Sequence, residues 1–288
     1  MRAQEKNQVL TRQNNVQTLI GIDIGTTNLS VAIVSIVESR LLASYTIPND
    51  SVIFSANSNF RLQDAEWITR KIHKVMDYLL RLYPCVSAIG ITGQMHGMVY
   101  LDDCGKAISP LYTWQDNRGN EQHEDRLSYC DKIHELTGYR LSSGYGFVTH
   151  YYNSLHSLVP ADAVTFCTIT DYVGMRLTGR RRPLLHPSNA ESLGLYNHVS
   201  HTFDAEAIRK LGLVQLQWPE IARDDCALGY FGKIPVAVSI GDNQASVFGT
   251  VQDEGHSALL NIGTGSQISR VVNGFVEVSG LECRNYIG

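Results

Sequence analysis

An apolar strand that runs into a Gly-Thr turn occurs twice in this sequence, and this repeat constrains the fold more than any other feature. Residues 22–27 read Ile-Asp-Ile-Gly-Thr-Thr, and residues 260–265 read Leu-Asn-Ile-Gly-Thr-Gly. In both copies the chain reverses at glycine, which has no Cβ to obstruct a tight turn. Two such turns far apart in the chain predict two related domains that face each other.

The stretch between residues 18 and 91 predicts half of a ribonuclease-H-like domain. Three β-branched runs predict an antiparallel meander, and they cover residues 18–22, 30–37 and 41–47. Apolar side chains at three- and four-residue steps over 64–83 predict a helix, with Asp64 as its N-cap and Pro84 at its end. A buried strand at 86–91 completes the unit.

Near Pro235 the same kind of pattern starts again. A strand at 236–240, a turn at 241–243 and a helix at 244–251 precede the second Gly-Thr turn. The intervening residues 121–222 have mostly helical and loop character. We therefore expect a disordered lead, a first domain and the beginning of an incomplete second domain, which cover residues 1–17, 18–234 and 235–288.

Charge and cysteine content exclude several classes of protein. The formal net charge is −4 and is spread along the chain, so no basic block predicts a nucleic-acid partner. No apolar run approaches the roughly 20 residues of a membrane-spanning helix, and the polar start lacks the apolar core of a signal peptide. The six cysteines form no C-x-x-C pair, which favours buried thiols in a reducing cytoplasm over a zinc site.

The first Gly-Thr turn has the chemistry of a phosphate site. Backbone N–H groups of Gly25, Thr26 and Thr27 can converge on an anion, and the two hydroxyls add donors. Asp23 at the strand end can hold a hydrated Mg²⁺ beside that phosphate. A tight hairpin without a ligand explains one such turn equally well, whereas two turns and an acidic residue favour nucleotide binding.

Asp242 follows the strand at 236–240 and opens the next helix. A carboxylate in this place can accept a proton from a substrate hydroxyl. The commoner role of an aspartate between a glycine and a helix is that of an N-cap, so the local pattern leaves both roles open.

Two further segments combine groups that suit a sugar ligand. Residues 93–97 read Gly-Gln-Met-His-Gly at the end of a buried strand, and residues 114–118 read Trp-Gln-Asp-Asn-Arg. An aromatic plate beside polar groups suits a ligand with an apolar face and many hydroxyls. The alternatives are an ordinary strand-to-loop turn for the first segment and a surface ion pair beside a core tryptophan for the second.

Five segments together resemble the FGGY carbohydrate kinases in their order and spacing; they are residues 21–27, 93–97, 114–118, 241–246 and 261–265. The resemblance runs from about residue 19 to the end of the chain. It implies an α/β protein with the actin-like ATPase (ribonuclease-H-like) fold. The first domain would bind the sugar, and the second, truncated domain would begin the nucleotide site.

The resemblance also implies a role for each matched residue. Asp242 would be the general base for the attacking sugar hydroxyl, and Asp23 would organise Mg²⁺ at the phosphates of ATP. The two phosphate loops would be Gly25, Thr26 and Thr27, and Gly263, Thr264 and Gly265. The sugar contacts would be Gln94, Met95, His96, Trp114, Asp116, Arg118 and Asn243, with Tyr145 as a further candidate.

Within the family, the motifs are most similar to those of sedoheptulokinases, on residues 113–116, 188–194 and 244–246. Xylulokinases typically read Trp-Asn-Asp where this chain reads Trp-Gln-Asp. The resemblance implies ATP-dependent phosphorylation of a ketose, with sedoheptulose favoured, at a primary hydroxyl. A xylulokinase-like kinase and a catalytically incomplete sugar-binding fragment are the alternatives, whereas actin- or chaperone-type ATPases lack such sugar segments.

The expected partners are a small sugar and ATP. An incomplete second domain would expose the apolar strand at 258–262, which is normally paired. We therefore also expect the chain to associate, with a homodimer as one form.

Overall fold

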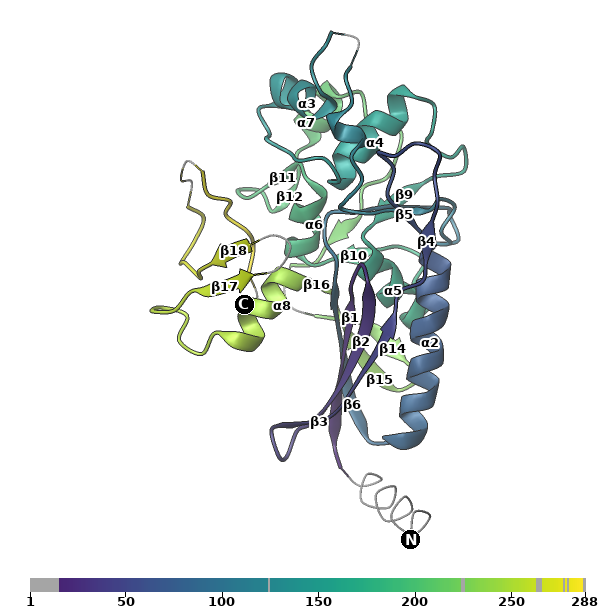
Figure 1. The fold of residues 1–288 in the computed structure, drawn as a ribbon, viewed down its shortest axis with the longest axis vertical. Coiled ribbons are helices and arrows are strands. Elements are labelled where there is room, and N and C mark those ends of the chain that lie inside the picture. The colour runs from purple at the N-terminus through teal and green to yellow at the C-terminus, as the bar shows by residue number, and fades with distance from the viewer. Residues whose placement is uncertain are drawn as a thin grey trace.

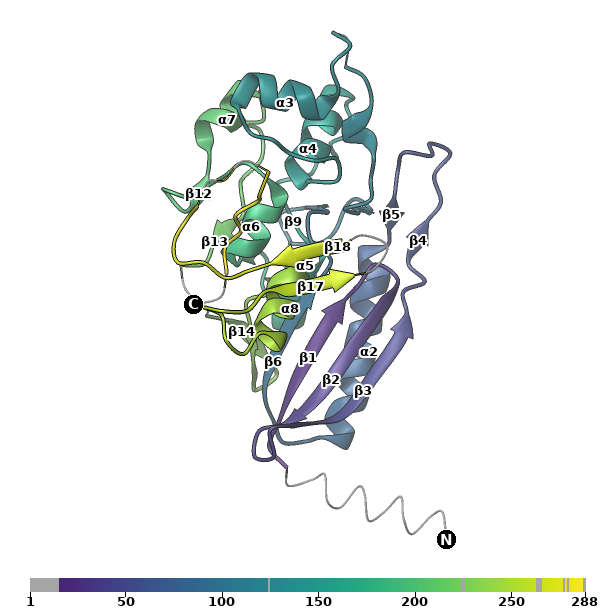
Figure 2. The same ribbon diagram turned by 60° about the vertical axis from the view of Figure 1, so that its left-hand side comes forward.

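The computed structural model describes residues 16–123, 125–223, 226–262, 266–276, 278 and 280–286. A twisted sheet with one long helix forms one half of the molecule, and a group of short helices forms the other (Figure 1). A hairpin close to the end of the chain lies at the side of the sheet (Figure 2). None of the described helices combines the length and the apolar character needed to cross a membrane.

The antiparallel meander that the β-branched runs predict is confirmed. The strands that build it and the next strand of the sheet are β1 (Thr18–Ile24), β2 (Asn28–Ser35), β3 (Arg40–Pro48) and β6 (Val86–Gly93). β1 pairs with β2 and β2 with β3 in antiparallel fashion, while β6 pairs with β1 in parallel. Every second residue of β1 is buried, so Ile22 and Ile24 face the core while Asp23 lies on the opposite face.

The long helix α2 (Ala65–Leu82) covers one face of the sheet (Figure 2). Asp64 caps it, because its carboxylate accepts a hydrogen bond from the backbone N–H of Trp67 at 2.8 Å. One stripe of the helix is fully buried against the sheet and consists of Ile68, Ile72, Met76 and Leu79. Each such side chain stabilises the fold by about 1.5–3 kcal/mol relative to an exposed position.

The middle of the chain forms short helices and small sheets, most of them beyond the upper end of the main sheet in Figure 1, while residues 169–178 pack beside α2 against that sheet. The helices are η1 (Arg118–Asn120), α3 (Tyr129–Thr137), α4 (Gly146–Leu155), α5 (Ile169–Thr178), α6 (Pro187–Leu193) and α7 (Ala205–Lys210). The strands are β4 (Val52–Ile53), β5 (Leu62–Gln63), β7 (Val99–Leu101), β8 (Leu111–Tyr112), β9 (Thr165–Cys167), β10 (Leu184–Leu185), β11 (Tyr196–Asn197), β12 (Thr202–Phe203) and β13 (Glu220–Ile221). One continuous apolar core joins this group to the sheet.

The main sheet continues past residue 235, where we expected the second domain to start. The strands concerned are β14 (Ala227–Phe231), β15 (Ile234–Ala237) and β16 (Ile240–Gly241). β15 and β16 both pair with β6 in parallel, and the order across the sheet is β14-β15-β6-β1-β2-β3. Backbone pairing therefore places residues 234–241 in the first domain, which corrects the expected boundary; the division into two domains stays a prediction.

The elements that follow β16 are α8 (Asp242–Thr250), β17 (Leu259–Ile262) and β18 (Ser266–Ser269). β17 and β18 pair as an antiparallel hairpin whose side chains are mostly exposed. The helix and the two paired strands expected here are thus confirmed. Gly263, Thr264 and Gly265, the expected second phosphate loop, lie outside the described residues.

The face of the sheet opposite α2 is hollowed. A cavity of about 630 Å³ lies there, between the sheet and α8. Its walls are mainly apolar and include the small residues Gly21, Ala88 and Gly90 and the ring of Phe248. Asp23 lines the same cavity, so it lies where solvent and a ligand can reach the sheet.

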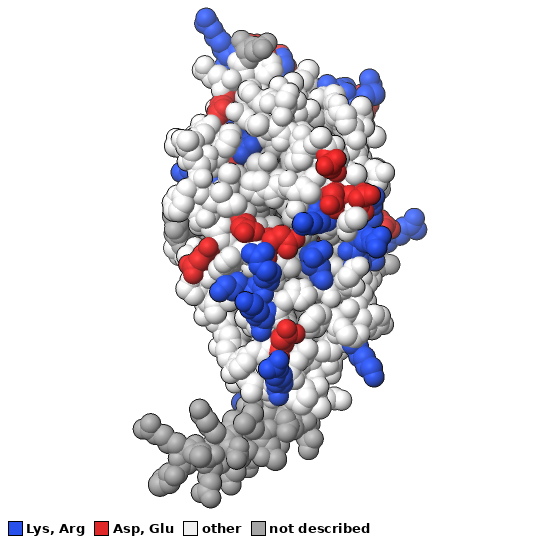
Figure 3. Space-filling model, turned by 90° about the vertical axis from the view of Figure 1, so that its right-hand side faces the viewer, with Lys and Arg blue, Asp and Glu red and all other residues white. Residues whose placement is uncertain are grey.

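Charged side chains are mixed on the face of the molecule shown in Figure 3. Lysine and arginine side chains lie beside aspartate and glutamate side chains there. This arrangement agrees with the dispersed charge of the sequence, because a nucleic-acid footprint would gather basic side chains without acidic ones.

Candidate active site

Asp23 and Asp242 lie at the same edge of the sheet, on either side of β6. In the strand register Gly93, the last residue of β6, pairs with Ile24 of β1 and with Gly241 of β16. The strands are parallel, so all three end at one edge, where open α/β sheets usually bind ligands. Asp23 is the residue before the last in β1 and Asp242 directly follows β16, so both lie at this edge of the sheet.

Asp242 is the first residue of α8, and it does not act as the cap of this helix. The N-cap is Gly241, which makes no side-chain hydrogen bond. The local pattern left open whether Asp242 is a cap or a functional carboxylate, and the geometry favours the second. Burial raises the pKa of Asp242 to about 6, although the residue keeps contact with solvent. The nearby Asp23 carboxylate raises this pKa further, while the Asn243 N–H and the Arg284 guanidinium lower it.

Asp23 has a raised pKa for the same main reason, since burial disfavours its ionised form. No side chain or backbone group among the described residues donates a hydrogen bond to its carboxylate at hydrogen-bonding distance. Both of its oxygens are therefore available to a hydrated metal ion. This state fits the Mg²⁺ role predicted for Asp23.

A buried polar cluster fixes the backbone that leads into Asp242. The Asp171 carboxylate accepts hydrogen bonds from Ser239 Oγ at 2.6 Å and from Asn189 Nδ2 at 2.9 Å. The same Asn189 amide also donates to the Ser239 carbonyl oxygen at 3.1 Å. One step further along the chain, Ser188 Oγ accepts a hydrogen bond from the Gly241 N–H at 3.2 Å. All of these contacts are buried, so they hold the segment just before Asp242 in one position.

Replacing Asn189 with alanine is expected to lower turnover as well as stability. The change removes the Asn189 hydrogen bond to the Asp171 carboxylate, which keeps those from Ser239 and Thr168, and it removes the donor to the Ser239 carbonyl oxygen. Loss of these buried hydrogen bonds costs about 1–3 kcal/mol. It also frees the strand end that carries Asp242. Urea unfolding and turnover of the same sample check both effects. The control is Asn153→Ala, because Asn153 is equally buried but hydrogen-bonds to Arg118 and Tyr100. Equal turnover in two equally destabilised variants would contradict the role of the cluster.

The first Gly-Thr turn is tied to two of the expected sugar-contact residues. Thr26 Oγ1 accepts a hydrogen bond from Trp114 Nε1 at 2.9 Å and donates one to Gln94 Oε1 at 3.3 Å. The Gly25 carbonyl oxygen accepts a hydrogen bond from Asn49 Nδ2 at 2.9 Å. A Cβ on Gly25 would also press against the Asn28 carbonyl oxygen, so the turn requires glycine here. Thr27 follows in the same turn and is exposed.

The segment after β6 places Gln94, Met95 and His96 next to this turn. A Cβ on Gly93 would collide with the carbonyl oxygen of Ile24, so glycine lets β6 and β1 end close together. Gln94 is buried and donates a hydrogen bond through Nε2 to Gln63 Oε1 at 2.9 Å. Because it also accepts a hydrogen bond from Thr26, it helps to hold the Thr26 turn in place. Its amide is thus already hydrogen-bonded within the protein. Met95 is equally buried, and His96 is partly buried.

His96 has a left-handed backbone with φ of 69°, which turns the chain sharply at this point. Its Nδ1 lies 2.9 Å from the Ser192 carbonyl oxygen, an acceptor only, so Nδ1 carries the proton and Nε2 is an acceptor. Burial lowers the pKa of His96 to about 4, and the ring is therefore neutral at pH 7. Its ring packs on that of Tyr145 at 4.2 Å between centroids. The sequence resemblance suggested Tyr145 for the same site.

Asp116 and Arg118 differ from their expected role as sugar contacts. Both side chains are fully buried, and Arg118 Nε donates to Asp116 Oδ1 at 2.7 Å while Nη2 donates to Oδ2 at 3.1 Å. The guanidinium also stacks on Phe60 and Tyr112 at 4.0 and 4.5 Å from the ring centroids. The pair is committed to the interior, so we correct its assignment: it positions the loop that carries Trp114.

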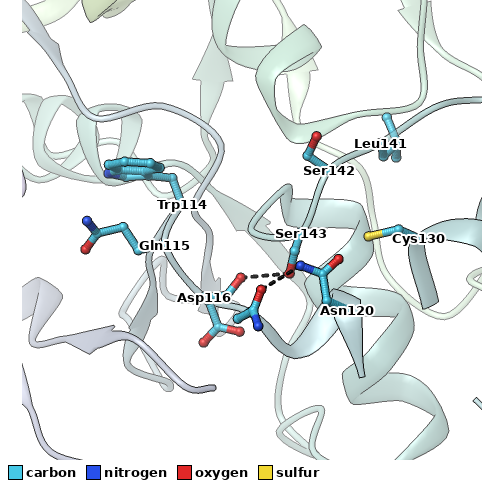
Figure 4. Close-up of a pocket in the computed structure, with 9 residues that line it drawn as sticks. Trp114, Gln115, Asp116, Asn120, Cys130, Leu141, Ser142 and Ser143 are labelled. Atoms are coloured by element: carbon cyan, nitrogen blue, oxygen red, sulfur yellow. Dashed lines mark hydrogen bonds between the residues drawn. The ribbon is translucent and has the colours of Figure 1, made fainter. Parts of the chain in front are cut away.

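Trp114 itself is 46% exposed and lies at the wall of a polar cavity of about 380 Å³. Figure 4 shows Trp114 and Gln115 on one side of this cavity and Ser142, Ser143 and Asn120 on the other. Ser143 Oγ donates to the Asp116 carbonyl oxygen at 2.9 Å, which joins the two walls. The exposed indole face is therefore available for stacking, as a sugar-binding tryptophan requires.

The last expected contact, Asn243, accepts a hydrogen bond from Ser269 of β18 through its Oδ1 at 3.2 Å. Three charged residues that were not predicted as site residues also lie at the site: Glu191, Glu282 and Arg284. Glu282 and Arg284 are far from the other site residues in the chain, and the Glu-x-Arg spacing is the one signal that could have found them. Local spacing cannot show that such a segment returns to the first domain.

Comparison with solved structures identifies the fold. The chain superimposes on xylulose kinase from Lactobacillus acidophilus with a TM-score of 0.78 and 20% identity, over 91% of this chain and 55% of that protein. It superimposes on gluconate kinase from the same organism with a TM-score of 0.77 and 20% identity, over 90% and 55%. The fold is therefore the actin-like ATPase fold of the sugar kinases, as expected.

A family model described as the FGGY family of carbohydrate kinases, N-terminal domain, matches residues 18–259. The chain thus belongs to the FGGY family. It is 30% identical to the sedoheptulokinase of Homo sapiens and 29% identical to that of Mus musculus, over 87% of this chain in each case. A glycerol kinase from Aquifex aeolicus is 24% identical over 81% of the chain. The chain spans 58% of the length of the two sedoheptulokinases.

Proposed function

We propose that the protein transfers a phosphoryl group from ATP to a primary hydroxyl of a ketose, with sedoheptulose favoured and Asp242 as the general base. The observation that carries this proposal is the place of Asp242. It is a carboxylate with a pKa of about 6 at the sheet edge that it shares with Asp23, and Arg284 lies close enough to both Asp242 and His96 to lower the pKa of each. The two similar sedoheptulokinases support the choice of ketose. A cytoplasmic location is part of the proposal.

The residues at the sheet edge fit a metal-bound nucleotide phosphate. The Asp23 carboxylate would hold Mg²⁺, and the turn at Gly25, Thr26 and Thr27 would face the phosphate chain. When bound, Mg²⁺ neutralises charge on the transferred phosphate. The protein's own contribution is to position the reactants, because phosphoryl transfer needs positioning and charge stabilisation more than covalent help.

Asp242 would act on the sugar rather than on the nucleotide. Since its pKa is about 6, the carboxylate is mostly ionised at pH 7 yet basic enough to accept a proton. It would accept a hydrogen bond from the attacking hydroxyl and take the proton as the phosphoryl group transfers. The exposed indole of Trp114 would stack on the carbon chain of the sugar, and the neutral Nε2 of His96 would accept from a hydroxyl.

Isothermal titration calorimetry with sedoheptulose, xylulose, glycerol and MgATP tests this function. Sedoheptulose binding that is tighter than xylulose binding, followed by ATP-dependent formation of a sugar phosphate, is the expected result. Tighter binding of xylulose would support a xylulokinase-like kinase instead. Sugar binding without nucleotide binding would support the sugar-binding module, and binding of none of the sugars would refute the proposal.

The rate of phosphoryl transfer is expected to rise with pH through about 6 and to level off above it. The folded-state pKa of Asp242 lies above the ordinary value of 3.8, so the ionised base is lost as the pH falls through about 6. Measurements of kcat/KM between pH 5 and pH 8 test this pH dependence of the rate. A flat profile would contradict the assignment of Asp242 as the base.

The fully buried Asp171 also has a pKa raised to about 6. Its contribution to the stability of the fold is fully present below pH 3.8 and declines as the pH rises through 6.

A further inference from the structure

The segment 281–286 crosses the site and contacts both the first domain and α8. The Asn285 backbone N–H donates to Glu191 Oε2 of α6 at 2.7 Å, and its side-chain amide donates to the same oxygen at 3.1 Å. On the other side, Gln244 of α8 donates through Nε2 to the Asn285 carbonyl oxygen at 3.0 Å. These bonds fix the segment between α6 and α8, and Arg284 of this segment lies close enough to Asp242 to lower its pKa.

Within this segment, Glu282 holds Arg284 in place. Arg284 Nη2 lies 2.8 Å from Glu282 Oε2, and Tyr145 donates its hydroxyl proton to Glu282 Oε1 at 3.0 Å. The Tyr145 ring in turn packs on His96. The carboxylate therefore links the guanidinium to the two aromatic rings at the site, and the arginine side chain is only 18% exposed.

The guanidinium that Glu282 holds points at the proposed sugar site. Arg284 Nη1 lies 3.9 Å from the Sδ of Met95. It is also close enough to Asp242 and to His96 to lower the pKa of each. Five N–H groups are present on a guanidinium, and the contact with Glu282 uses only part of them. The remaining donors are suited to the hydroxyl oxygens of a ligand.

The charges around Arg284 are mostly negative. Four carboxylates face this region: Asp23 of β1, Asp242 of α8, Glu191 of α6 and Glu282 of the segment itself. His96 is neutral at pH 7, and His198 already lies 3.0 Å from Glu191 Oε1. Among the described residues Arg284 is thus the one arginine or lysine at the site, and a carboxylate neutralises it. An additional negative charge on the sugar would meet net repulsion.

We propose that Arg284, held by Glu282, binds the hydroxyl groups of the sugar, and that the carboxylates around it select neutral polyhydroxy compounds over sugar acids and sugar phosphates. The inference rests on the proposed function, because it concerns the same site. It adds a specificity-determining residue and a substrate class. The solved relatives include both a xylulose kinase and a gluconate kinase, so the family fold alone does not decide this class.

Calorimetry with sedoheptulose tests the role of Arg284. Arg284→Ala is expected to weaken binding by about ten-fold to a hundred-fold, the usual range for a lost charged hydrogen bond. Arg284→Lys is expected to recover part of the affinity, because it keeps the charge but not the planar fork. The matched control is Arg270→Ala, since Arg270 is exposed and bonds to the Gly255 carbonyl oxygen instead. If Arg284→Ala binds as tightly as the control, the inference is overturned.

The charge selectivity has its own test, with D-gluconate as the anionic probe. The unmodified protein is expected to bind gluconate at least about ten-fold more weakly than sedoheptulose. Glu282→Gln removes one negative charge but keeps an acceptor for the Tyr145 hydroxyl, so it is expected to narrow this ratio. A ratio that does not change in Glu282→Gln overturns the charge argument. If the unmodified protein binds neither ligand, the proposed function itself is refuted. If it binds the sugar and neither Arg284→Ala nor Glu282→Gln changes that binding, only this inference is refuted.

Discussion

Turnover of the Asp242→Ala variant is expected to fall by about 10²–10⁴-fold, the usual contribution of a general base. Sugar affinity is expected to change much less, because the other proposed sugar contacts remain in place. The physical reason lies in the pKa of about 6, which lets this carboxylate take a proton near neutral pH. Steady-state kinetics with MgATP and sedoheptulose give kcat, and calorimetry on the same sample gives the affinity.

Two companion variants make the Asp242 result interpretable. Asp242→Asn keeps the size of the side chain and the start of α8, so a loss of turnover there isolates the loss of the base. Asp253→Asn changes an exposed aspartate in the loop after the same helix and is expected to leave turnover unchanged. Near wild-type turnover in Asp242→Ala would exclude this residue as the general base. The sheet edge would then hold the proposed metal-binding Asp23 without a proposed base beside it.

Arg118→Ala is expected to lower the free energy of unfolding by about 3–5 kcal/mol. The substitution leaves the Asp116 carboxylate buried without its counter-charge and empties the space between the rings of Phe60 and Tyr112. Breaking a buried ion pair in this way is costly, because one charge stays out of water with no partner. Urea unfolding followed by circular dichroism measures the effect.

The control for Arg118 is an ion pair at the surface. Arg40 lies 2.6 Å from Glu38, and both side chains are about half exposed, at 62% and 48%. Arg40→Ala is expected to cost less than about 1 kcal/mol. The comparison also distinguishes the two roles proposed for Arg118. If Arg118→Ala kept normal stability and lost only sugar affinity, the original assignment as a sugar contact would be correct after all.

Local sequence patterns predicted the structure correctly where a single helix or strand determines it. The apolar steps of α2 and the acceptor side chain of Asp64 are properties of a single helix, and both appear as predicted. The β-branched runs likewise gave the meander of β1, β2 and β3. The two acidic residues were found because each follows a recognisable strand, and strand ends gather at one edge of a parallel sheet.

Local sequence patterns gave a wrong prediction where the structure depends on contacts between residues far apart in the sequence. The strand after Pro235 was expected to start a new domain, but its hydrogen-bonding partner β6 lies far earlier in the sequence. The Asp116–Arg118 pair was expected at the surface or at a ligand, and its burial depends on Phe60 and Asn153, which come from other elements. Residue type alone shows neither the partner of a strand nor the depth of an ion pair.

The position of β6 between β1 and β16 has a consequence for how members of this family can diverge in the sugar that they accept. Neighbouring strands lie about 4.8 Å apart, so the backbones that carry Asp23 and Asp242 are held roughly 10 Å from each other by main-chain hydrogen bonds. Main-chain bonding is insensitive to side-chain identity. Loops around Trp114, Tyr145 and Arg284, the proposed sugar contacts, can therefore diverge while the span between Asp23 and Asp242 stays constant.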